Sequence, residues 1–316
     1  MKKRLAMAAI VCSAASVQAQ APYPDKPVHF VVAFAAGGYA DAVARLVGQK
    51  LGDKLGQSVV VENRGGAGGN LATRQVAAAK SDGYTLLIDT TAFAINPTLY
   101  RNAGYELKDF VPVAYTVSTP GIFTVHASSS ITTLRELVQQ KGKRVTYGTA
   151  GVGSSSHLSA DYLLRTLSGL DAVHVPYQGG GPAVTAAISN QVEVLSASMP
   201  PVLPHIRAGK LKVLAVSSLK PVAALPGVPT VAESGFPGFE ESSWVGVFAP
   251  AGTSAAIVER LNRDINSTLV DPEAKQRFAG MGAEANPMSS AEFTDYVRSE
   301  IAKWAKLVKA SGVSEE

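Results

Sequence analysis

The chain is poor in cysteine: Cys12 is the only one among its 316 residues. This residue lies near the N-terminus, inside an apolar segment that we expect to be absent from the mature protein. A fold held together by disulfides is therefore excluded, and its stability has to come from a hydrophobic core. Hydrophobic residues make up 46% of the sequence. A chain of this length and composition can form two domains, each with its own core.

Long apolar runs are also missing. The apolar segment near the N-terminus, Leu5–Ala15, is shorter than the roughly 18 residues that span a bilayer. Basic residues at positions 2–4 precede it, and the small-residue pattern of Val17–Ala19 follows it. These features predict a secretory signal peptide over residues 1–19, cleaved after Ala19. We therefore expect an exported protein.

The sequence also lacks a large excess of either positive or negative charge. The formal net charge is +4, and three of the positive charges lie in the predicted signal peptide, so the mature chain is close to +1. So small a net charge does not indicate binding to nucleic acid or to an anionic membrane surface. The sequence has no HExxH or GxSxG motif, and its histidines and carboxylates show no metal-ligand spacing. We expect no metal, no cofactor and no nucleic-acid partner.

The most informative stretch is a strand–loop–helix joint at Val28–Arg45. Val28–Phe34 is a continuous apolar run, typical of a buried parallel strand. Gly37 and Gly38 follow, and they allow a ligand to come close to the main chain. The next apolar residues share one face of a helix that ends near Gly56: Val43, Leu46, Val47, Leu51 and Leu55. The free amides at the start of such a helix form a seat for an anion, although a tight turn without a ligand fits this joint equally well.

A second joint of the same kind follows the predicted strand Val145–Thr149. The loop Ala150–Gly153 leads into Ser154, Ser155 and Ser156 at the start of a helix predicted over Ser155–Leu167. The hydroxyls add hydrogen-bond donors to the free amides of the helix, and we expect at least one serine to cap it. Two such seats facing each other would suit a ligand with a carboxylate at each end.

Strands and helices alternate through most of the chain, which predicts an α/β fold with parallel sheets. A bent extended segment, Phe110–Val125, is expected to leave the first domain near Thr119, and the strand Trp244–Phe248 to return to it. We therefore predict domain 1 over residues 20–119 and 244–316, and domain 2 over residues 120–243. Ligands of open α/β sheets bind at the carboxyl ends of the strands, which here can face each other across a cleft.

Two other stretches allow more than one interpretation. The turn Arg64–Gly69 resembles a phosphate cradle, but it has no lysine–hydroxyl pair, so ordinary turn chemistry is favoured. The last predicted helix has an apolar side that includes Phe293, Val297 and Trp304. A partner-binding stripe is possible there, but packing against the first sheet is favoured because the polar side is ordinary.

Many short motifs, in order along nearly the whole mature chain, resemble those of the Bug-type solute-binding proteins of the tripartite tricarboxylate transporter (TctC) family. The matching stretches are Tyr23–Pro27, Gly37–Gly38 with Asp41, Val61–Arg64, Gly66–Gly69, Asp82–Leu86, Ala150–Leu158, His174–Tyr177, Pro226–Thr230, Glu233–Gly235 and Ala249–Thr253. So many ordered matches are far more specific than any single motif.

The resemblance implies an α/β, two-lobed periplasmic binding protein of type II, a Venus flytrap with a ligand cleft between its lobes. It implies a periplasmic receptor for a small organic carboxylate, either a di- or tricarboxylate or an aromatic acid. Its partner would be a membrane permease of the tripartite tricarboxylate type. It also implies no catalytic activity and no cofactor, and we expect a monomer.

In relatives, the two loops grip a ligand carboxylate, partly through ordered water. Carried over to this sequence, the role falls to Gly37, Gly38, Tyr39, Ala40, Thr149, Ala150, Gly151, Ser154, Ser155 and Ser156, with Asp41, Thr91, His157 and Tyr177 as further candidates. Asp41 is favoured as the residue that holds the first turn of its helix, with direct ligand contact as the alternative. His157 is favoured as a helix residue over a catalytic base.

The sequence departs from the family at four relevant places. Ala36 stands where relatives usually have proline, Tyr39 where they have a small residue, and Gln178 where they commonly have lysine. The loop Ser196–Met199 lacks the acidic or amide residue often found there. A tyrosine at the lip of the pocket and less charge inside it would favour a flatter, more apolar ligand, such as an aromatic acid, over citrate.

Two other functions remain open on the sequence alone. The serines beside His157 leave a secreted hydrolase possible, because a catalytic triad need not be local in sequence. A sensor that presents its bound ligand to a signalling receptor would have the same sequence features as a transport receptor.

Overall fold

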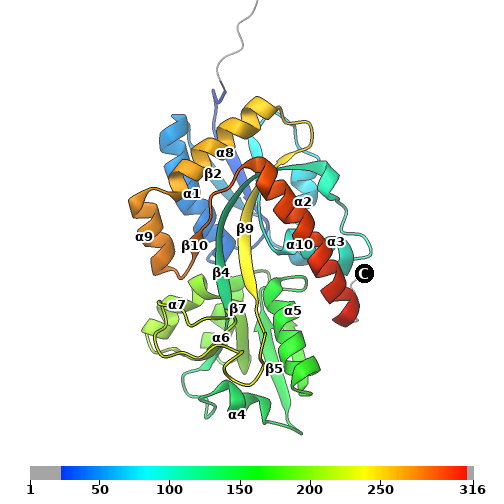
Figure 1. Ribbon diagram of the computed structural model, residues 1–316, viewed down its shortest axis with the longest axis vertical. Coiled ribbons are helices and arrows are strands. Elements are labelled where there is room, and N and C mark those ends of the chain that lie inside the picture. The colour runs from blue at the N-terminus through cyan, green and yellow to red at the C-terminus, as the bar shows by residue number, and fades with distance from the viewer. Residues whose placement is uncertain (1–22, 312–316) are drawn as a thin grey trace, which may run out of the picture.

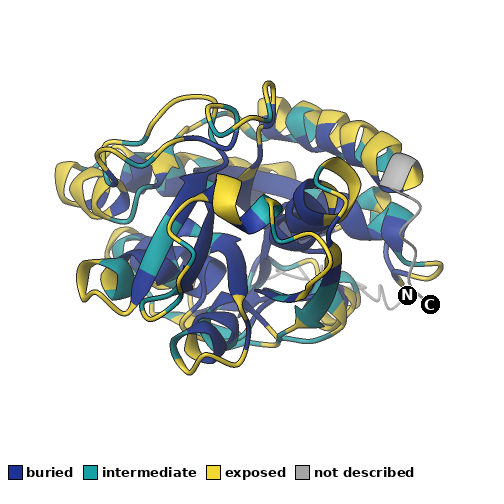
Figure 2. Cartoon of the chain, turned by 90° about the horizontal axis from the view of Figure 1, so that it is seen from below, coloured by how far each residue is buried: buried dark blue, intermediate teal, exposed yellow. Residues whose placement is uncertain are grey.

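The computed structural model describes residues 23–311, so the predicted signal peptide and its cleavage site lie outside the described residues. Figure 1 shows two groups of elements, one above the other, with two long strands running through both. Over residues 23–311, no helix is both long and apolar enough to cross a bilayer. Buried residues fill the strands and the inner helix faces, and exposed residues lie on the outer helix faces and loops (Figure 2).

The strands form one curled sheet in the order β2-β1-β3-β9-β4-β7-β5-β6, with β8 and β10 also paired to β4. Their bounds are β1 Val28–Val32, β2 Val59–Asn63, β3 Thr85–Thr90, β4 Phe110–His126, β5 Arg144–Thr149, β6 Asp171–Pro176, β7 Val194–Ser198, β8 Leu211–Val216, β9 Ser242–Pro250 and β10 Glu284–Ala285.

Helices cover this sheet. Their bounds are α1 Tyr39–Leu55, α2 Asn70–Ala77, α3 Ala92–Leu99, α4 Leu134–Val138, α5 Ser155–Asp161, α6 Gly180–Ile188, α7 Met199–Arg207, α8 Ala255–Leu269, α9 Pro272–Gly280 and α10 Ser290–Ser311. The helix predicted over Ser155–Leu167 continues beyond α5 as a π-helical segment, Tyr162–Leu167. The helix α3 has no counterpart in the sequence prediction.

The long strand β4 connects the two groups of elements. Its first part pairs with β9, from Phe110 opposite Pro250 to Pro120 opposite Ser242. From Gly121 onward it pairs instead with β7 and β8. The change of partners falls next to Thr119, where the sequence predicts the first crossing. The two-domain division itself stays a prediction.

The expectation of parallel sheets is correct for only part of the structure. β1 pairs in parallel with β2 and β3, and β5 pairs in parallel with β6 and β7. β9 is antiparallel to both β3 and β4, and β4 is antiparallel to β7 and β8. The reason is that β4 and β9 pass between the two groups in opposite directions, so they cannot follow the βαβ rule.

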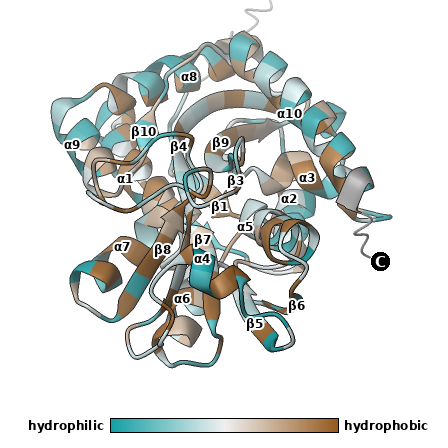
Figure 3. Ribbon diagram, turned by 60° about the horizontal axis from the view of Figure 1, so that its bottom comes forward, coloured by the Kyte–Doolittle hydropathy of each residue, from teal (hydrophilic) through white to brown (hydrophobic). Residues whose placement is uncertain are grey.

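The hydrophobic residues of the strands and inner helix faces (Figure 3) separate into a large core around β1, β3 and β9 and two smaller cores around β5 to β8. The predicted apolar face of α1 is buried, and Gly56 ends this helix with a φ of 66°. Such a left-handed residue satisfies a carbonyl of the last helical turn.

The last helix, α10, belongs to the large core. Phe293 and Val297 are fully buried, and Trp304 is nearly so. Trp244 and Trp304 both donate a hydrogen bond to the Glu300 carboxylate, each over 3.0 Å. This confirms core packing as the role of the apolar side of the helix.

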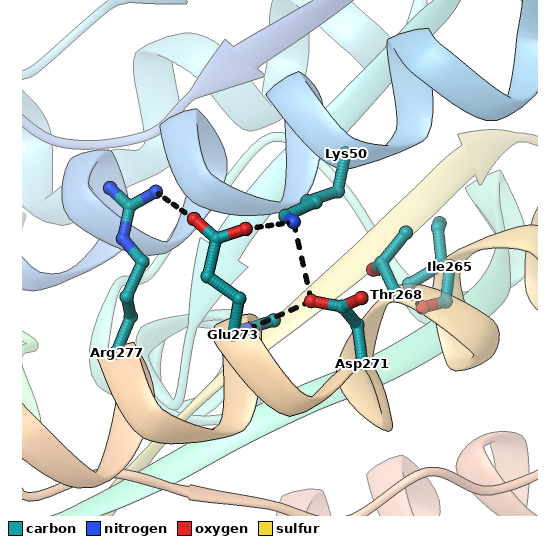
Figure 4. A network of polar contacts seen from close by, with 7 residues as sticks. Lys50, Ile265, Thr268, Asp271, Glu273 and Arg277 are labelled. Carbon is teal, nitrogen blue, oxygen red and sulfur yellow. Dashed lines mark hydrogen bonds and ion pairs between the residues drawn. The ribbon is translucent and has the colours of Figure 1, made fainter.

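A surface network joins α1 to α9 (Figure 4). Lys50 lies 3.2 Å from Asp271, the cap of α9, and also contacts the Glu273 carboxylate. Arg277 follows one turn later, 4.0 Å from Glu273. Exposed ion pairs stabilise a protein by only about 0–1 kcal/mol. The network therefore orients α9 more than it stabilises the fold.

Asp89, at the end of β3, is a fully buried acid. Its carboxylate accepts hydrogen bonds from the Thr90 amide at 2.7 Å and the Thr73 hydroxyl at 3.0 Å. Burial nevertheless raises the pKa of Asp89 to about 7. The folded protein thus holds a proton here more tightly than the unfolded chain does, and this part of its stability is lost as the pH rises toward 7.

We predict that Asp89→Asn removes this pH dependence. The variant should gain stability relative to the wild type between about pH 4 and pH 7, by about 1.4 kcal/mol for each unit of pKa shift. Urea unfolding of both proteins at several pH values measures the difference. A difference that stays constant over this range would contradict the prediction.

Candidate functional site

Several helices begin around one small cavity. Its volume is about 30 Å³, which holds about two water molecules. The lining residues are Phe34, Tyr39, Ala40, Thr90, Ala150, Ser154, Ser155, Ser156, Gly180, Ser198, Pro201 and Ser243. We call this space the central cavity. It draws residues from both groups of elements.

Four helix N-termini reach the central cavity. Tyr39 and Ala40 open α1, Ser154 caps α5, Gly180 opens α6 and Ser198 caps α7. The first amides of a helix have no acceptor within the helix, and its dipole is positive at this end. None of the twelve residues that line the central cavity carries a charge. Its polarity comes from backbone dipoles and hydroxyls, an arrangement suited to a small anion.

The first predicted seat is held by Asp41. Gly37, with a φ of 78°, donates its amide to Asp41 Oδ2 over 2.9 Å. Asp41 Oδ1 lies 2.9 Å from Arg45 Nη2. Asp41 is 5% exposed and does not line the central cavity. Its contacts match the favoured interpretation, in which it holds the first turn of the helix.

Two of the three serines of the second seat, Ser154 and Ser156, are hydrogen-bonded to each other. Ser154 caps α5 by accepting from the His157 amide at 3.2 Å, and its hydroxyl lies 2.6 Å from the Gly151 carbonyl. Ser154 and Ser156 are joined at 3.0 Å, and the Ala150 amide donates to Ser156 at 3.4 Å. One serine thus caps the helix, as expected, while all three line the central cavity.

His157 lies behind this wall and outside the cavity lining. Its ring stacks on His174 with centroids 4.0 Å apart, and His174 Nε2 lies 2.6 Å from the Thr149 hydroxyl. Burial lowers the pKa of His157 to about 4 and that of His174 to about 3. Both rings are therefore neutral near pH 7. The cluster fixes Thr149 and the loop that follows it.

Tyr39 lies deeper than the sequence predicts. It is 5% exposed, and its hydroxyl donates toward the Val117 carbonyl at 3.1 Å and the Ser243 carbonyl at 3.4 Å. Burial raises the pKa of Tyr39 well above its ordinary value. The expectation of a tyrosine at the lip is wrong, because the ring reaches inward to β4 and β9 and forms part of the cavity wall.

A second cavity, of about 210 Å³, adjoins the central one and shares Phe34 and Ala150 with it. We call it the side cavity. The turn Gly66–Gly69 lies on one side, and Gly151 and Tyr177 lie on the other. The glycine-rich turn therefore faces the second seat.

The structure brings together only some of the predicted site residues. Those that line the central cavity are Tyr39, Ala40, Ala150, Ser154, Ser155 and Ser156, and those that line the side cavity are Ala150, Gly151 and Tyr177. Gly37, Gly38, Asp41, Thr91, Thr149 and His157 line neither cavity. Thr91 is fully buried and accepts a hydrogen bond from the Trp244 amide at 3.1 Å.

Sequence reasoning missed six residues of the central cavity: Phe34, Thr90, Gly180, Ser198, Pro201 and Ser243. Thr90 ends β3, Gly180 opens α6, and Ser198 ends β7 and precedes α7, so strand ends and helix starts were available signals. Ser243 gave no such signal, because only the tertiary structure brings it to the site.

Backbone contacts close the site. Ala35 donates its amide to the Gln178 carbonyl over 2.9 Å. A side chain at Gly68 would meet the Val152 carbonyl at 2.4 Å, and one at Gly181 would meet the Ala36 carbonyl at 2.6 Å. These glycines allow the two walls to touch.

Comparison with known proteins identifies the family. Residues 43–313 match the model of the tripartite tricarboxylate transporter family receptor, TctC. Protein BugT of Bordetella pertussis is 35% identical over 99% of this chain and 98% of its own length.

Solved structures agree with this. The periplasmic binding protein BugD is 36% identical with a TM-score of 0.88, over 93% of this chain and all of BugD. Rpa4515 of R. palustris, solved with adipate, is 34% identical with a TM-score of 0.88, over 92% of this chain and 99% of that one. The chain therefore belongs to the TctC family of periplasmic solute receptors.

Proposed function

We propose that this receptor binds a small organic carboxylate in the central cavity and passes it to a membrane permease of the tripartite tricarboxylate type. The observation that carries the proposal is the convergence of four helix N-termini on a cavity without charged side chains. An anion taken out of water loses its hydration, and free amides at the positive ends of helices replace it.

The binding cycle that we propose contains no chemical step, so the protein is not an enzyme. Ser154 and Ser156 are hydrogen-bonded to backbone groups and to each other, while the imidazole of His174 lies against Thr149. These contacts support binding rather than catalysis as the role of the serines.

Two lobes would open and close around the cavity. Domain 1 would be residues 20–119 and 244–316, and domain 2 residues 120–243, with β4 and β9 as the connection. A ligand shifts the balance toward the closed form by the difference in its affinity for the two forms. The permease would recognise the closed monomer in the periplasm, after removal of the signal peptide.

The ligand that fits best has one carboxylate at the helix starts and a longer body in the side cavity. Rpa4515, with its adipate, supports a linear dicarboxylate. An aromatic acid stays in the proposal because Phe34 lies at the junction of the two cavities. Citrate, with three charges, is the poorest fit to a lining without cations.

We predict that purified mature protein is stabilised by adipate or benzoate more than by citrate. A ligand at a hundred times its dissociation constant adds about 2.7 kcal/mol, which raises the melting temperature by several degrees. Thermal-shift measurements on a panel of these acids test this. If none of them produces a shift, the proposed function is wrong.

We predict that Ser198→Asp weakens binding at least tenfold while it preserves the fold. The new charge faces the bound anion in a region of low dielectric. Ser198 makes no side-chain cap bond in α7, so the substitution removes no capping hydrogen bond, and a carboxylate is favourable beside the positive end of the helix dipole. Folding stability should therefore change little. Calorimetry gives the affinity, and urea unfolding gives the stability.

Ser254→Asp is the matched control, because Ser254 caps α8 at an exposed position outside the cavity lining. It should leave affinity unchanged. Equal affinities for Ser198→Asp and Ser254→Asp would rule out the central cavity as the anion site.

We predict that Gly181→Ala hinders the two walls of the site from closing together without destabilising the fold. Gly181 lies in α6, where alanine is the better helix former, by up to about 1 kcal/mol. The added methyl group would lie 2.6 Å from the Ala36 carbonyl in the closed arrangement. The unliganded variant should be as stable as the wild type, but it should bind acid about tenfold more weakly.

Small-angle scattering should show that Gly181→Ala stays expanded at ligand concentrations that compact the wild type. Gly280→Ala is the control, since a Cβ there would meet nothing within 4 Å. Wild-type affinity and compaction in Gly181→Ala would show that this contact is not part of the bound form.

A further inference from the structure

A buried acid, Glu241, lies directly behind the central cavity. It precedes β9 and is 6% exposed. Its carboxyl group lies over Gly121, at the point where β4 changes partners, and a Cβ at Gly121 would be only 2.1 Å from Glu241 Oε2. Glu241 also lies near the Ser155 hydroxyl, which acts on its carboxyl group, and Ser155 lines the central cavity. One side chain therefore separates this acid from the proposed ligand.

The hydrogen bonds around Ser217 allow Glu241 to be either charged or neutral. The Ser217 hydroxyl is 2.6 Å from the Glu241 main-chain carbonyl and 3.0 Å from Glu241 Oε2. A hydroxyl has a single hydrogen, and the carbonyl can only accept. The hydroxyl can donate to a charged carboxylate, or it can donate to the carbonyl and accept from a protonated carboxyl group. Ser217 can therefore stay hydrogen-bonded when Glu241 gains a proton.

The surroundings of Glu241 contain little opposing charge. Burial raises the pKa of Glu241, and its bonds to Ser155, Ser217 and the Gly121 backbone offset part of that rise. The titratable groups that act on it across the described elements are Tyr39 of α1 and Lys303 of α10. Lys303 lies 3.1 Å from Glu300 Oε1, so its charge is engaged there.

We propose that Glu241 is a proton-linked positioning residue: when a carboxylate ligand binds in the central cavity, Glu241 takes up a proton and becomes neutral. This inference rests on the function proposed above. Two negative charges separated by one serine side chain repel each other strongly where water is excluded. The proton comes from solvent, and Ser155 stays free to donate toward the ligand because Glu241 no longer needs its hydrogen.

The sign of the effect follows from linkage. The ligand-bound protein holds the Glu241 proton up to a higher pH than the empty protein does. In the pH range between these two limits, binding takes up a proton and affinity falls as the pH rises, by up to tenfold per pH unit for one proton. Below this range Glu241 is neutral in both forms, and the effect vanishes.

The test is calorimetry with adipate, or with benzoate if that acid binds more tightly, between pH 6.5 and 8.5. Both acids are fully ionised there. The dependence of the binding heat on the ionisation heat of the buffer counts the protons taken up. We expect the wild type to take up a fraction of a proton, up to one, for each ligand bound. Glu241→Gln should take up none, and its affinity should no longer depend on pH.

Glu284→Gln is the control, because it removes a carboxylate that is exposed on β10 and outside the cavity lining. It should keep the proton uptake of the wild type. A wild-type protein that binds acid without proton uptake overturns this inference and leaves the proposed function intact. Absence of binding by any acid overturns both.

A measurement on the wild type alone keeps the inference testable even if Glu241→Gln fails to fold. Infrared difference spectra should show the band of a protonated carboxylic acid gaining intensity when unlabelled ligand binds above pH 7. The same spectra without such a band would contradict the inference, whatever the behaviour of Glu241→Gln.

Discussion

The site depends on the convergence of the starts of α1, α5, α6 and α7 on the central cavity. A buried amide without an acceptor costs about as much as a lost hydrogen bond, so a dry, empty cavity of this kind is unfavourable. Under the proposed function, a carboxylate would satisfy these groups through charge-assisted hydrogen bonds. Recognition of the anion would then follow from helix geometry, without a cationic side chain.

The helix starts come together because β4 and β9 hold both sides of the site. Tyr39 contributes to this arrangement, since its hydroxyl donates toward Val117 of β4 and Ser243 of β9. The opposing walls then meet through backbone at Gly68 and Gly181, where any larger residue would collide with a carbonyl. The glycines serve close approach of two surfaces, and this explains why the turn Gly66–Gly69 resembles a phosphate cradle without the residues of one.

Local sequence patterns were sufficient to predict the elements that have a strong hydrophobic periodicity or a clear terminating residue. The strand β1, the apolar face of α1 and its stop at Gly56 follow from residues close together in the chain. The helix α3 was missed because its apolar residues include Pro97 and show no amphipathic pattern. The antiparallel placement of β9 was missed because pairing such as Leu87 with Phe248 depends on the whole fold. The residues of the site divide in the same way. The serines of α5 were predicted from their own loop, but Ser243, inside β9, joins them only in three dimensions.

A receptor that delivers its ligand must also release it. Release is easier when helix dipoles, rather than charged side chains, hold the ligand. The field of a helix end is short-ranged and falls off within about one turn, and solvent screens it. Opening the walls would therefore weaken all four helix starts together, whereas a lysine in the site would still attract the anion through water. Glu241 acts in the same direction, because an acid that regains its charge behind Ser155 repels a departing carboxylate. A cavity without cations and with a titratable acid behind it thus binds strongly only while it is closed.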